Sequence, residues 1–390
     1  MKLKRFLRNF FDGLGAVLVF AACVGFAYHW DPTRIYYKRL KAYFDPYRYE
    51  EIDPRLAPRD PDALIGIRDR SGADAVRTNI VKAIWGPYGY PVKAQPDAVV
   101  RDFLNPSGDA GAEACGWIRA RYPKLVCMLD IYRKWRRLAR LDQITVQITP
   151  DLVAKVAVFW PVAPKGTLVL FQEGYANTYH DQHRILEWLV AAGYTVAALN
   201  MPGYGDSVGM MPDMDDNPLR SFFTPPVVTI NHVLAQGGVD RVAMVGLSAG
   251  GWITTALSAV DQRIRRSYSI AGVVPAYQQR GREWPLAQQY PPFVEAASIL
   301  DLFVLGASPR ERKQWQIYNR FDRCCYEGLR SLLWDAAVTD AVRRAGGGRF
   351  EVHIDETHAR HKISRWALDR IIEDLDAWGS ARKEGPNGRE

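Results

Sequence analysis

From residue 144 onward the chain alternates short apolar runs with amphipathic stretches. The apolar runs are five to eight residues long and rich in Val, Ile, Leu and Phe, and Gly, Pro or Asn residues separate many of them from the next stretch. Such runs predict strands, at 144–148, 154–160, 167–172, 194–199, 241–245, 266–273, 314–319 and 350–354. Apolar residues at helical spacing predict helices at 181–192, 226–234, 249–260, 329–345 and 363–378. This alternation predicts the α/β class, a mostly parallel sheet with helices on both faces.

The region before residue 141 has a different character. Residues 31–140 are rich in Pro, Tyr and Arg, and contain helical fragments near 73–85 and 112–122 but few strand signals. We therefore expect an N-terminal extension wrapped on a main domain at 141–380. Within that domain, residues 278–312 turn from Pro- and Gln-rich to apolar and are expected to form a small cap that shapes a substrate pocket. Residues 381–390 are expected to be a disordered tail.

The first 30 residues have the composition of a membrane-targeting segment. Four basic residues, at positions 2, 4, 5 and 8, precede an uncharged run of 18 residues, Gly13–Trp30. An uncleaved anchor and a cleaved signal peptide both fit this pattern. The run exceeds an ordinary signal core and ends in Tyr28, His29 and Trp30, an interfacial belt, which favours the anchor. We expect a membrane-anchored protein with its main domain outside the cytoplasm, or a secreted one if the segment is cleaved.

The charge of the chain is concentrated in one segment. Net charge is +8, and residues 119–140 alone hold eight Lys or Arg against one Asp. Ile131, Trp135 and Leu138 recur there at helical spacing, which predicts an amphipathic helix with one apolar face. Such a helix either packs on the main domain or faces anionic lipid headgroups. No nucleic-acid motif accompanies the charge, so we expect no nucleic-acid partner.

The five cysteines point to disulfides at most. None falls in a zinc-binding pattern, so no metal site is expected. In an oxidising compartment Cys115 can pair with Cys127 across a short loop, whereas Cys324 and Cys325 can pair elsewhere or stay reduced.

A Gly-Leu-Ser-Ala-Gly string at 246–250 joins an expected strand to an expected helix. Gly246 and Gly250 carry no Cβ, so the backbone can turn sharply and present the Ser248 hydroxyl at the carboxyl end of the strand. Ser248 would also lie at a helix N-terminus, where free N–H groups favour developing negative charge. With this strand, turn and helix the chain resembles the α/β-hydrolase family, and its serine esterases in particular, over residues 144–378.

Two upstream segments extend the resemblance. Residues 200–207, Asn-Met-Pro-Gly-Tyr-Gly-Asp-Ser, are similar to a family turn of the form D-x-x-G-x-G-x-S, with Asn in place of Asp. Residues 168–175 are similar to the strand that carries the family's His-Gly oxyanion turn, with Gln-Glu replacing His. The resemblance implies an oxyanion hole made by the backbone N–H of Ala249 together with that of Tyr175 or Ala176.

The resemblance also implies an acid and a histidine, in that order, after the serine. Asp322 follows the expected strand 314–319, one strand–helix unit before the loop that holds His358 and His361. Either histidine can be the base. His358 is slightly preferred because it lies four residues beyond Ile354, the expected strand end. A rival assignment makes 302–305 the strand and Glu311 the acid.

These residues predict a serine hydrolase that cleaves carboxylic esters, carboxylesterase- or lipase-like, through an acyl-enzyme at Ser248. Its substrate would be a small-molecule or lipid ester, and it would need no cofactor. An acyltransferase would pass the same acyl group to an alcohol, and a non-catalytic binding protein would use the fold alone. The sequence leaves both alternatives open.

Overall fold

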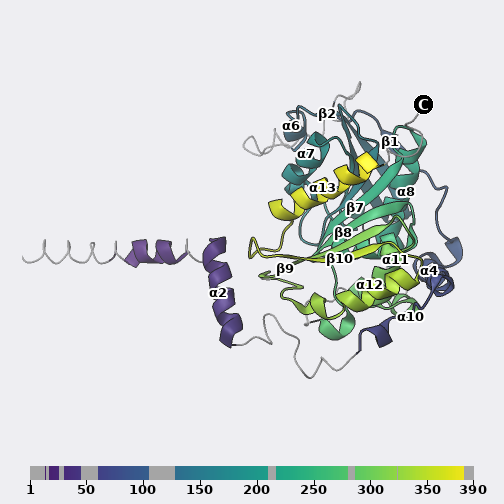
Figure 1. Ribbon diagram of the computed structural model, residues 1–390. Coiled ribbons are helices and arrows are strands. Elements are labelled where there is room, and N and C mark those ends of the chain that lie inside the picture. The colour runs from purple at the N-terminus through teal and green to yellow at the C-terminus, as the bar shows by residue number, and fades with distance from the viewer. Residues whose placement is uncertain are drawn as a thin grey trace, which may run out of the picture.

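A single twisted sheet forms the centre of the protein in the computed structural model (Figure 1), which describes residues 14, 17–25, 30–44, 60–104, 128–209, 217–279, 286–322 and 324–381. Along the sheet the strand order is β1-β2-β3-β5-β4-β7-β8-β9-β10, and β6 pairs with β3. The described strands are β1 Ala98–Val100, β2 Leu138–Thr149, β3 Leu152–Pro161, β4 Thr167–Gln172, β5 Thr195–Leu199, β6 Val208–Gly209, β7 Arg241–Leu247, β8 Ile264–Ile270, β9 Lys313–Asn319 and β10 Arg349–Asp355.

Strand direction divides the sheet into two parts. Strands β1, β2 and β3 pair antiparallel, and β3 pairs antiparallel with β5. From β5 to β10 every neighbouring pair is parallel. The carboxyl ends of these parallel strands therefore share one edge of the sheet, where ligands bind in open α/β folds.

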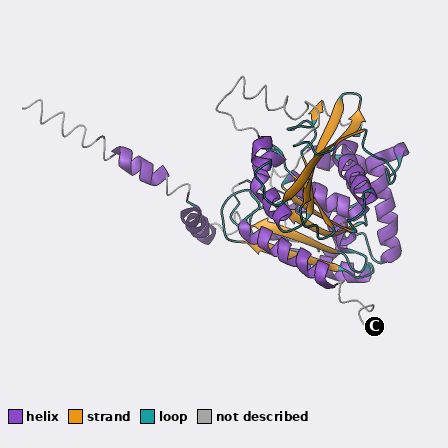
Figure 2. Ribbon diagram, turned by 90° about the horizontal axis from the view of Figure 1, so that it is seen from above, coloured by secondary structure: helices purple, strands orange, loops and turns teal. Residues whose placement is uncertain are grey.

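The sheet is covered on both faces, which is why the central strands β4, β5 and β7 are almost continuously apolar. The described helices are α2 Asp31–Phe44, α4 Arg70–Trp85, α6 Met128–Tyr132, α7 His183–Ala191, α8 Leu219–Ala235, α9 Ala249–Val260, α10 Pro291–Ala296, α11 Ile299–Ala307, α12 Asp335–Arg344 and α13 Arg365–Ala381. Figure 2 shows helices on either side of the sheet. This arrangement confirms the predicted α/β class.

Alternating side chains of β9 show which helices lie on opposite faces. Gln314 and Gln316 donate to Ser258 and Thr255 of α9, at 2.9 and 3.0 Å. Lys313, one residue before Gln314, pairs with Asp374 of α13. Because successive side chains of a strand point to opposite faces, α9 and α13 cover opposite faces of the sheet.

Part of the region before residue 141 belongs to the main core. Ile65, Ile67 and Ile80 are fully buried in the same hydrophobic cluster as the central strands, and helix α4 packs against α8, α9 and α10. Helix α2 lies beside the carboxyl ends of β9 and β10, and residues 17–25 form a helix that points away from the domain (Figures 1 and 2). Within the part of the chain that the structure describes, no helix combines the length and the apolar character needed to cross a bilayer.

The predicted basic helix across 119–140 is wrong for its described part. Residues 128–140 form the five-residue helix α6 and then enter strand β2 at Leu138. Trp135 is buried, and Arg140 reaches the buried carboxylate of Asp142 instead of solvent. Pairing with β3 outweighs the helical spacing, because a strand in the sheet gains a full ladder of hydrogen bonds. The expected fragment 112–122 and the pair Cys115 and Cys127 lie outside the described residues.

The second half of the expected cap is a core element. Residues 299–307 form helix α11, which is almost wholly buried and packs on α9 and α12. Residues 302–305 are thus helical, so the rival acid loses its strand, and Glu311 instead forms a surface ion pair with Arg265. The final helix, expected at 363–378, continues through Gly379 to Ala381.

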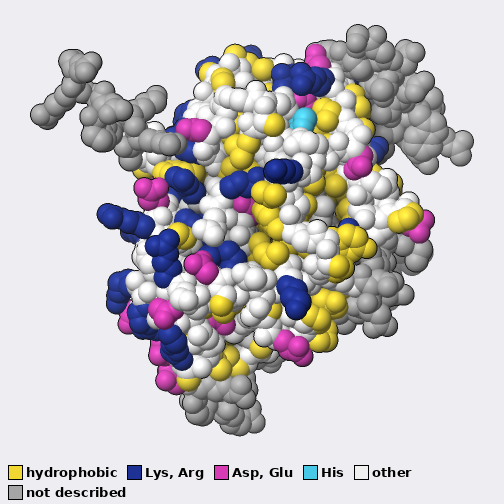
Figure 3. Space-filling model, turned by 90° about the vertical axis from the view of Figure 1, so that its right-hand side faces the viewer, with side chains coloured by type: hydrophobic (Ala, Val, Ile, Leu, Met, Phe, Trp, Pro, Cys, Tyr) yellow, Lys and Arg dark blue, Asp and Glu magenta, His cyan; other side chains and the backbone are white. Residues whose placement is uncertain are grey.

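Surface charge on the face shown in Figure 3 is mixed. Lys and Arg side chains are interspersed there with Asp and Glu, and hydrophobic side chains form a band through the middle. Surface arginines have acidic partners, as in Arg343 with Asp340 and Arg344 with Asp62. Basic side chains of this kind are paired locally and, within the described residues, do not form a uniform basic patch.

Candidate active site

Ser248 occupies a sharp turn between β7 and α9. Its backbone has φ 58° and ψ −127°, a left-handed conformation that is uncommon for any residue except glycine. The turn is held by two bonds: Ser248 N–H donates to Ile270 O at 2.9 Å, and Ser248 O accepts from Gly251 N–H at 2.8 Å. Ser248 is only partly buried and is the N-terminal flanking residue of α9. The strand-turn-helix predicted from the sequence is therefore present.

Glycines around the turn permit close backbone approach. A Cβ on Gly246 would lie 2.1 Å from Gly250 O, and one on Gly250 would lie 2.2 Å from Gln172 O. A Cβ on Gly174 would lie 2.9 Å from both Leu247 O and the Ser248 Cβ. Contacts under 3.0 Å exclude any side chain at these positions. The absence of side chains brings the end of β4 directly against the Ser248 turn.

The backbone groups expected to form an oxyanion hole flank this contact. Ala249 is the first residue of α9, where helix N–H groups lack intrahelical partners. Tyr175 follows Gly174 on the other side of Ser248, and Ala176 has a left-handed φ of 68°. The Tyr175 ring meets the Tyr204 ring edge to face, with centroids 5.8 Å apart. The residues 173–176 and 200–207, similar to two family turns, therefore lie side by side, and the first of them contacts the Ser248 turn.

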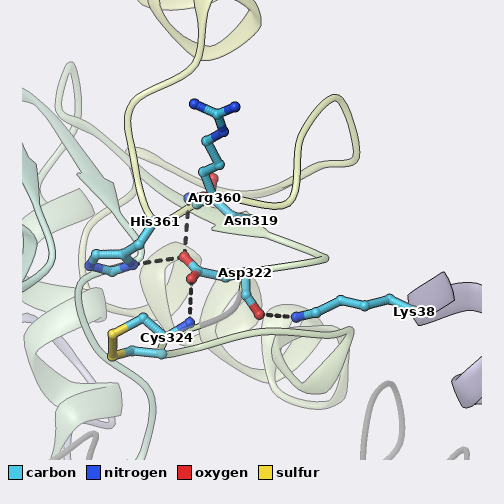
Figure 4. The surroundings of a disulfide bond; sticks show 7 residues. Lys38, Asn319, Asp322, Cys324, Arg360 and His361 are labelled. Atoms are coloured by element: carbon cyan, nitrogen blue, oxygen red, sulfur yellow. Dashed lines mark hydrogen bonds and ion pairs between the residues drawn. A yellow bond between two sulfur atoms is a disulfide. The ribbon is translucent and has the colours of Figure 1, made fainter. Parts of the chain in front are cut away.

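Asp322 and His361 form a close pair. His361 Nδ1 lies 2.7 Å from Asp322 Oδ2, and the Asp322 side chain is fully buried (Figure 4). The other carboxylate oxygen, Oδ1, accepts from Cys324 N–H at 2.8 Å. His361 Nε2 is buried and has no hydrogen-bond partner among the described residues. The ring thus presents one nitrogen to an acid and keeps the other free.

His358 has different surroundings. Its Nδ1 accepts from Arg360 N–H at 3.1 Å, so the proton belongs on Nε2, which lies 3.3 Å from Asp355 Oδ2. The side chain is only 3% exposed. Burial would raise the pKa of Asp355, but hydrogen bonds from His358, Ser364 and Thr357 lower it to about 2. The structure therefore places His361, and not His358, beside Asp322.

The three groups come from separate strands of one sheet edge. Ser248 follows β7, Asp322 follows β9 and His361 follows β10, all at carboxyl ends of parallel strands. The strand order explains how residues 74 and 39 positions apart are gathered at the same edge.

Glu173 is a feature of the site whose burial the sequence does not reveal. It is 1% exposed, and one of its carboxylate oxygens has no hydrogen-bond partner in the described chain. Burial raises the pKa of Glu173 to about 8, even though the N–H of Gly174 opposes the shift. A carboxyl that is neutral near pH 7 therefore lies one residue before the turn that contacts Ser248. The sequence signal was a glutamate at the end of an otherwise apolar strand.

The remaining polar residues near these turns support the backbone. Asn200 Oδ1 accepts from Tyr179 N–H at 2.8 Å. In the position where the family turn has Asp, this Asn therefore acts as a hydrogen-bond acceptor for the backbone. His180 bridges Tyr132 and Asp206, at 2.6 and 3.3 Å. No group of three or more potential metal ligands occurs within the described residues.

Comparison with known proteins identifies the architecture. Residues 167–365 match the family model described as the alpha/beta hydrolase fold. No curated protein matches the sequence.

Solved structures resemble the chain at low sequence identity. Acetyl xylan esterase 1 from Thermoanaerobacterium sp. JW/SL YS485 has 14% identity and a TM-score of 0.50, covering 85% of this chain and 99% of its own. The acetyl xylan esterase from Paenibacillus sp. R4 has 13% identity and a TM-score of 0.51, covering 81% of this chain and 98% of its own. A methylesterase has 15% identity and a TM-score of 0.56, covering 81% of this chain and 66% of its own. These likenesses establish the fold.

Proposed function

Because the chain belongs to the alpha/beta hydrolase fold family, we propose that it is a serine hydrolase that cleaves carboxylic esters through an acyl-enzyme at Ser248. The observation that carries the proposal is the pairing of His361 with buried Asp322 at the sheet edge where the Ser248 turn also lies. The esterase activities named for the similar folds are consistent with this chemistry.

The proposed reaction assigns one role to each group. His361 Nε2 accepts the proton of the Ser248 hydroxyl as its oxygen attacks the ester carbonyl, and the ester C–O bond breaks as the same proton passes to the leaving alcohol. Asp322 fixes the His361 ring and stabilises its positive charge. Backbone N–H groups of Ala249 and of Tyr175 or Ala176 stabilise the oxyanion. Water then attacks the acyl-enzyme by the same route and restores Ser248.

Labelling with a fluorophosphonate tests this assignment. The wild-type protein should be labelled on Ser248, and Ser248→Ala should remove both labelling and hydrolysis while the melting temperature changes little. Ser380→Ala is the matched control, because that exposed hydroxyl lies near the end of α13 and donates only to the backbone oxygen of Asp376. Labelling of Ser248→Ala at the wild-type rate would overturn the proposal.

A series of p-nitrophenyl esters of increasing acyl length, with and without an added alcohol acceptor, then defines the acyl group and separates hydrolysis from acyl transfer.

We further propose that the N-terminal segment holds the enzyme at a lipid surface outside the cytoplasm. Val17, Val19 and Phe20 are 63%, 64% and 71% exposed on the helix that points away from the domain. Tyr36 and Phe44 of α2 are similarly exposed, at 69% and 75%. Exposed apolar and aromatic side chains after a basic N-terminus suit the headgroup region of a bilayer. The disulfide between Cys324 and Cys325 is consistent with an oxidising compartment.

A further inference from the structure

A disulfide joins two adjacent residues in the loop that follows the proposed acid. Cys324 and Cys325 are bonded to each other, so the expectation that they pair elsewhere or stay reduced is wrong (Figure 4). The loop begins at Asp322 and closes where Gly328 N–H donates to Arg320 O at 3.0 Å. The disulfide is therefore part of a short closed loop whose first side chain is the Asp322 carboxylate.

The first cysteine of the disulfide is hydrogen-bonded to that carboxylate through its backbone N–H. Cys324 N–H donates to Asp322 Oδ1 at 2.8 Å, while Oδ2 faces His361 at 2.7 Å. One oxygen is thus held by the loop and the other holds the histidine. Rotation of the carboxylate would break both contacts, so the position of the Cys324 N–H helps to set the orientation of the His361 ring.

Helix α2 holds the same loop from outside. Lys38 donates to the backbone oxygen of Asp322 (Figure 4). Its ammonium also pairs with Glu327, at 2.6 Å. Arg39 lies over the Phe321 ring, 5.5 Å from its centroid. These contacts fix the two ends of the loop, and the disulfide constrains its middle.

The two cysteines differ in exposure. Cys324 is exposed, whereas Cys325 is buried, with 9% exposure. The bond thereby ties the residue that contacts Asp322 to one anchored in the core. Opening it would free the rotations on either side of the Cys324–Cys325 peptide, and this freedom opposes the single geometry that the Asp322 contacts require. A soluble thiol would approach the bond from the side of Cys324, the exposed residue of the pair.

We propose that Cys324 and Cys325 form a redox modification site that controls the orientation of Asp322, so that the enzyme is fully active with the bond closed and weakly active with it open. This inference rests on the proposed function, because it assigns Asp322 to the catalytic machinery. The disulfide is a positioning element: it acts on the reaction only through Asp322 and His361.

The switching reaction is a thiol–disulfide exchange with a dithiol. One thiolate of the dithiol attacks the Cys324 sulfur, the S–S bond breaks, and Cys325 leaves as a thiolate that takes up a proton. The second thiolate of the reagent then attacks the mixed disulfide and releases Cys324. The protein gains two electrons and two protons, and the dithiol is oxidised to a cyclic disulfide. An oxidised dithiol or disulfide reverses the exchange.

Kinetics before and after reduction test the proposal. Treatment of the full chain with reduced dithiothreitol should lower kcat for a p-nitrophenyl ester about ten- to hundredfold, the usual weight of a hydrogen bond to a charged group. KM should change little. The acidic limb of the kcat/KM profile should move to lower pH, because a displaced carboxylate stabilises the imidazolium less. Reoxidation should restore both kcat and the position of the acidic limb. Full kcat in protein whose Cys324 and Cys325 are shown by mass spectrometry to be reduced would overturn the proposal.

Two double variants identify the responsible bond. Cys324→Ser with Cys325→Ser should start with lowered kcat and should not respond to dithiothreitol. Cys115→Ser with Cys127→Ser should respond as the wild type does. A response that disappears in the second variant and persists in the first would contradict the proposal.

Failure of the proposed function looks different, because the oxidised wild type would then show neither hydrolysis nor Ser248 labelling. Circular dichroism and melting of the reduced protein distinguish a displaced acid from unfolding: a kcat loss that merely follows unfolding would also count against the proposal.

Discussion

Two histidines of one loop, three residues apart, have opposite environments. His361 gives one nitrogen to Asp322 and leaves the other without a partner in the described chain. His358 Nδ1 accepts from Arg360 N–H, and its buried Nε2 faces Asp355 Oδ2 at 3.3 Å without a well-aligned hydrogen bond. Asp355 also accepts from Thr357 and Ser364, and Ser364 Oγ in turn accepts from Ala367 N–H at 3.0 Å, so this cluster secures the start of α13. His358 thus supports the loop that presents His361.

Separate replacement of the two histidines should give different losses. His361→Ala should lower kcat by about three to six orders of magnitude, as for loss of a general base, with little change in melting temperature. His358→Ala should lower the free energy of unfolding by about 1–3 kcal/mol, because it removes a buried partner of Asp355, and should reduce kcat much less. Ester kinetics and urea unfolding of both variants provide the comparison. Near-normal turnover in His361→Ala would transfer the role of base to another residue.

Glu173 should make stability depend on pH. Its pKa is raised by burial to about 8 in the folded protein, whereas an unfolded Glu titrates near 4.3. Between these values the folded state holds one proton more than the unfolded state. The free energy of unfolding should therefore fall by up to about 1.4 kcal/mol per pH unit as the pH rises towards 8.

Glu173→Gln isolates this contribution. Glutamine keeps the shape and cannot ionise, so the slope from this residue should vanish. Urea unfolding at pH 6, 7 and 8 measures the difference from wild type, with the exposed Glu373→Gln in α13 as control. Parallel pH profiles of wild type and Glu173→Gln would mean that Glu173 is ionised throughout.

At the scale of elements, the Ser248 turn depends on the contact between the ends of β4 and β7. Gly250→Ala would place a Cβ 2.2 Å from Gln172 O, a backbone atom that can yield only if β4 moves. Displacement of β4 would carry Gly174 and Tyr175 away from Ser248. The variant should lose about 1–3 kcal/mol of unfolding free energy and most of its kcat.

Gly72→Ala is the control for this change. Gly72 lies in the first turn of α4, and its nearest neighbour to a new Cβ, Asp69 Oδ1, is 3.4 Å away. Alanine should leave stability unchanged or raise it by up to about 1 kcal/mol, since it favours the helix. Melting curves and ester kinetics of both variants make the comparison. A Gly250→Ala variant as stable and active as Gly72→Ala would show that β4 and the turn are not tightly coupled.

The elements differ in how far sequence could predict them. The expected 249–260 helix matches α9 and the expected 167–172 strand matches β4, because apolar period, glycine stops and strand length all agree there. The 128–140 segment shows the opposite case: helical spacing predicts one continuous helix, but only Met128–Tyr132 is helical and the chain enters strand β2 at Leu138. Helix α11 falls within the expected cap, because an almost uniformly apolar sequence does not reveal which layer of the fold it joins.

The candidate site shows the same limit. The Ser248 turn could be predicted because its strand, glycines and helix are contiguous. The choice between His358 and His361 could not, since it depends on how a loop folds around Asp322 and Asp355. The Cys324–Cys325 bond and the burial of Glu173 are likewise consequences of tertiary packing.

For the whole molecule, the arrangement of α2 links the N-terminal segment to the site loops. Lys38 and Arg39 contact the loop after β9, while Arg39 and Asp31 reach Glu356 and Arg360 in the loop after β10. The opposite side of α2 exposes Tyr36 and Phe44. If this side rests on a bilayer, the edge that carries Ser248, Asp322 and His361 lies close to the lipid surface.

Vesicle binding tests this placement. The full chain should bind vesicles of neutral phosphatidylcholine through its exposed apolar helix, and should bind vesicles containing anionic phosphatidylserine more tightly. The four basic residues of the first eight contribute up to about 1 kcal/mol each near an anionic surface, so replacing them with Gln should remove most of the preference for anionic lipid. Deletion of residues 1–30 should weaken binding to both kinds of vesicle while hydrolysis of a soluble ester is retained.

If the protein without residues 1–30 still prefers anionic vesicles as strongly as the full chain, the attraction would come from the main domain, with the basic segment 119–140 as its first candidate. Sedimentation with vesicles at low and high salt separates the apolar from the electrostatic contribution, because only the latter is screened.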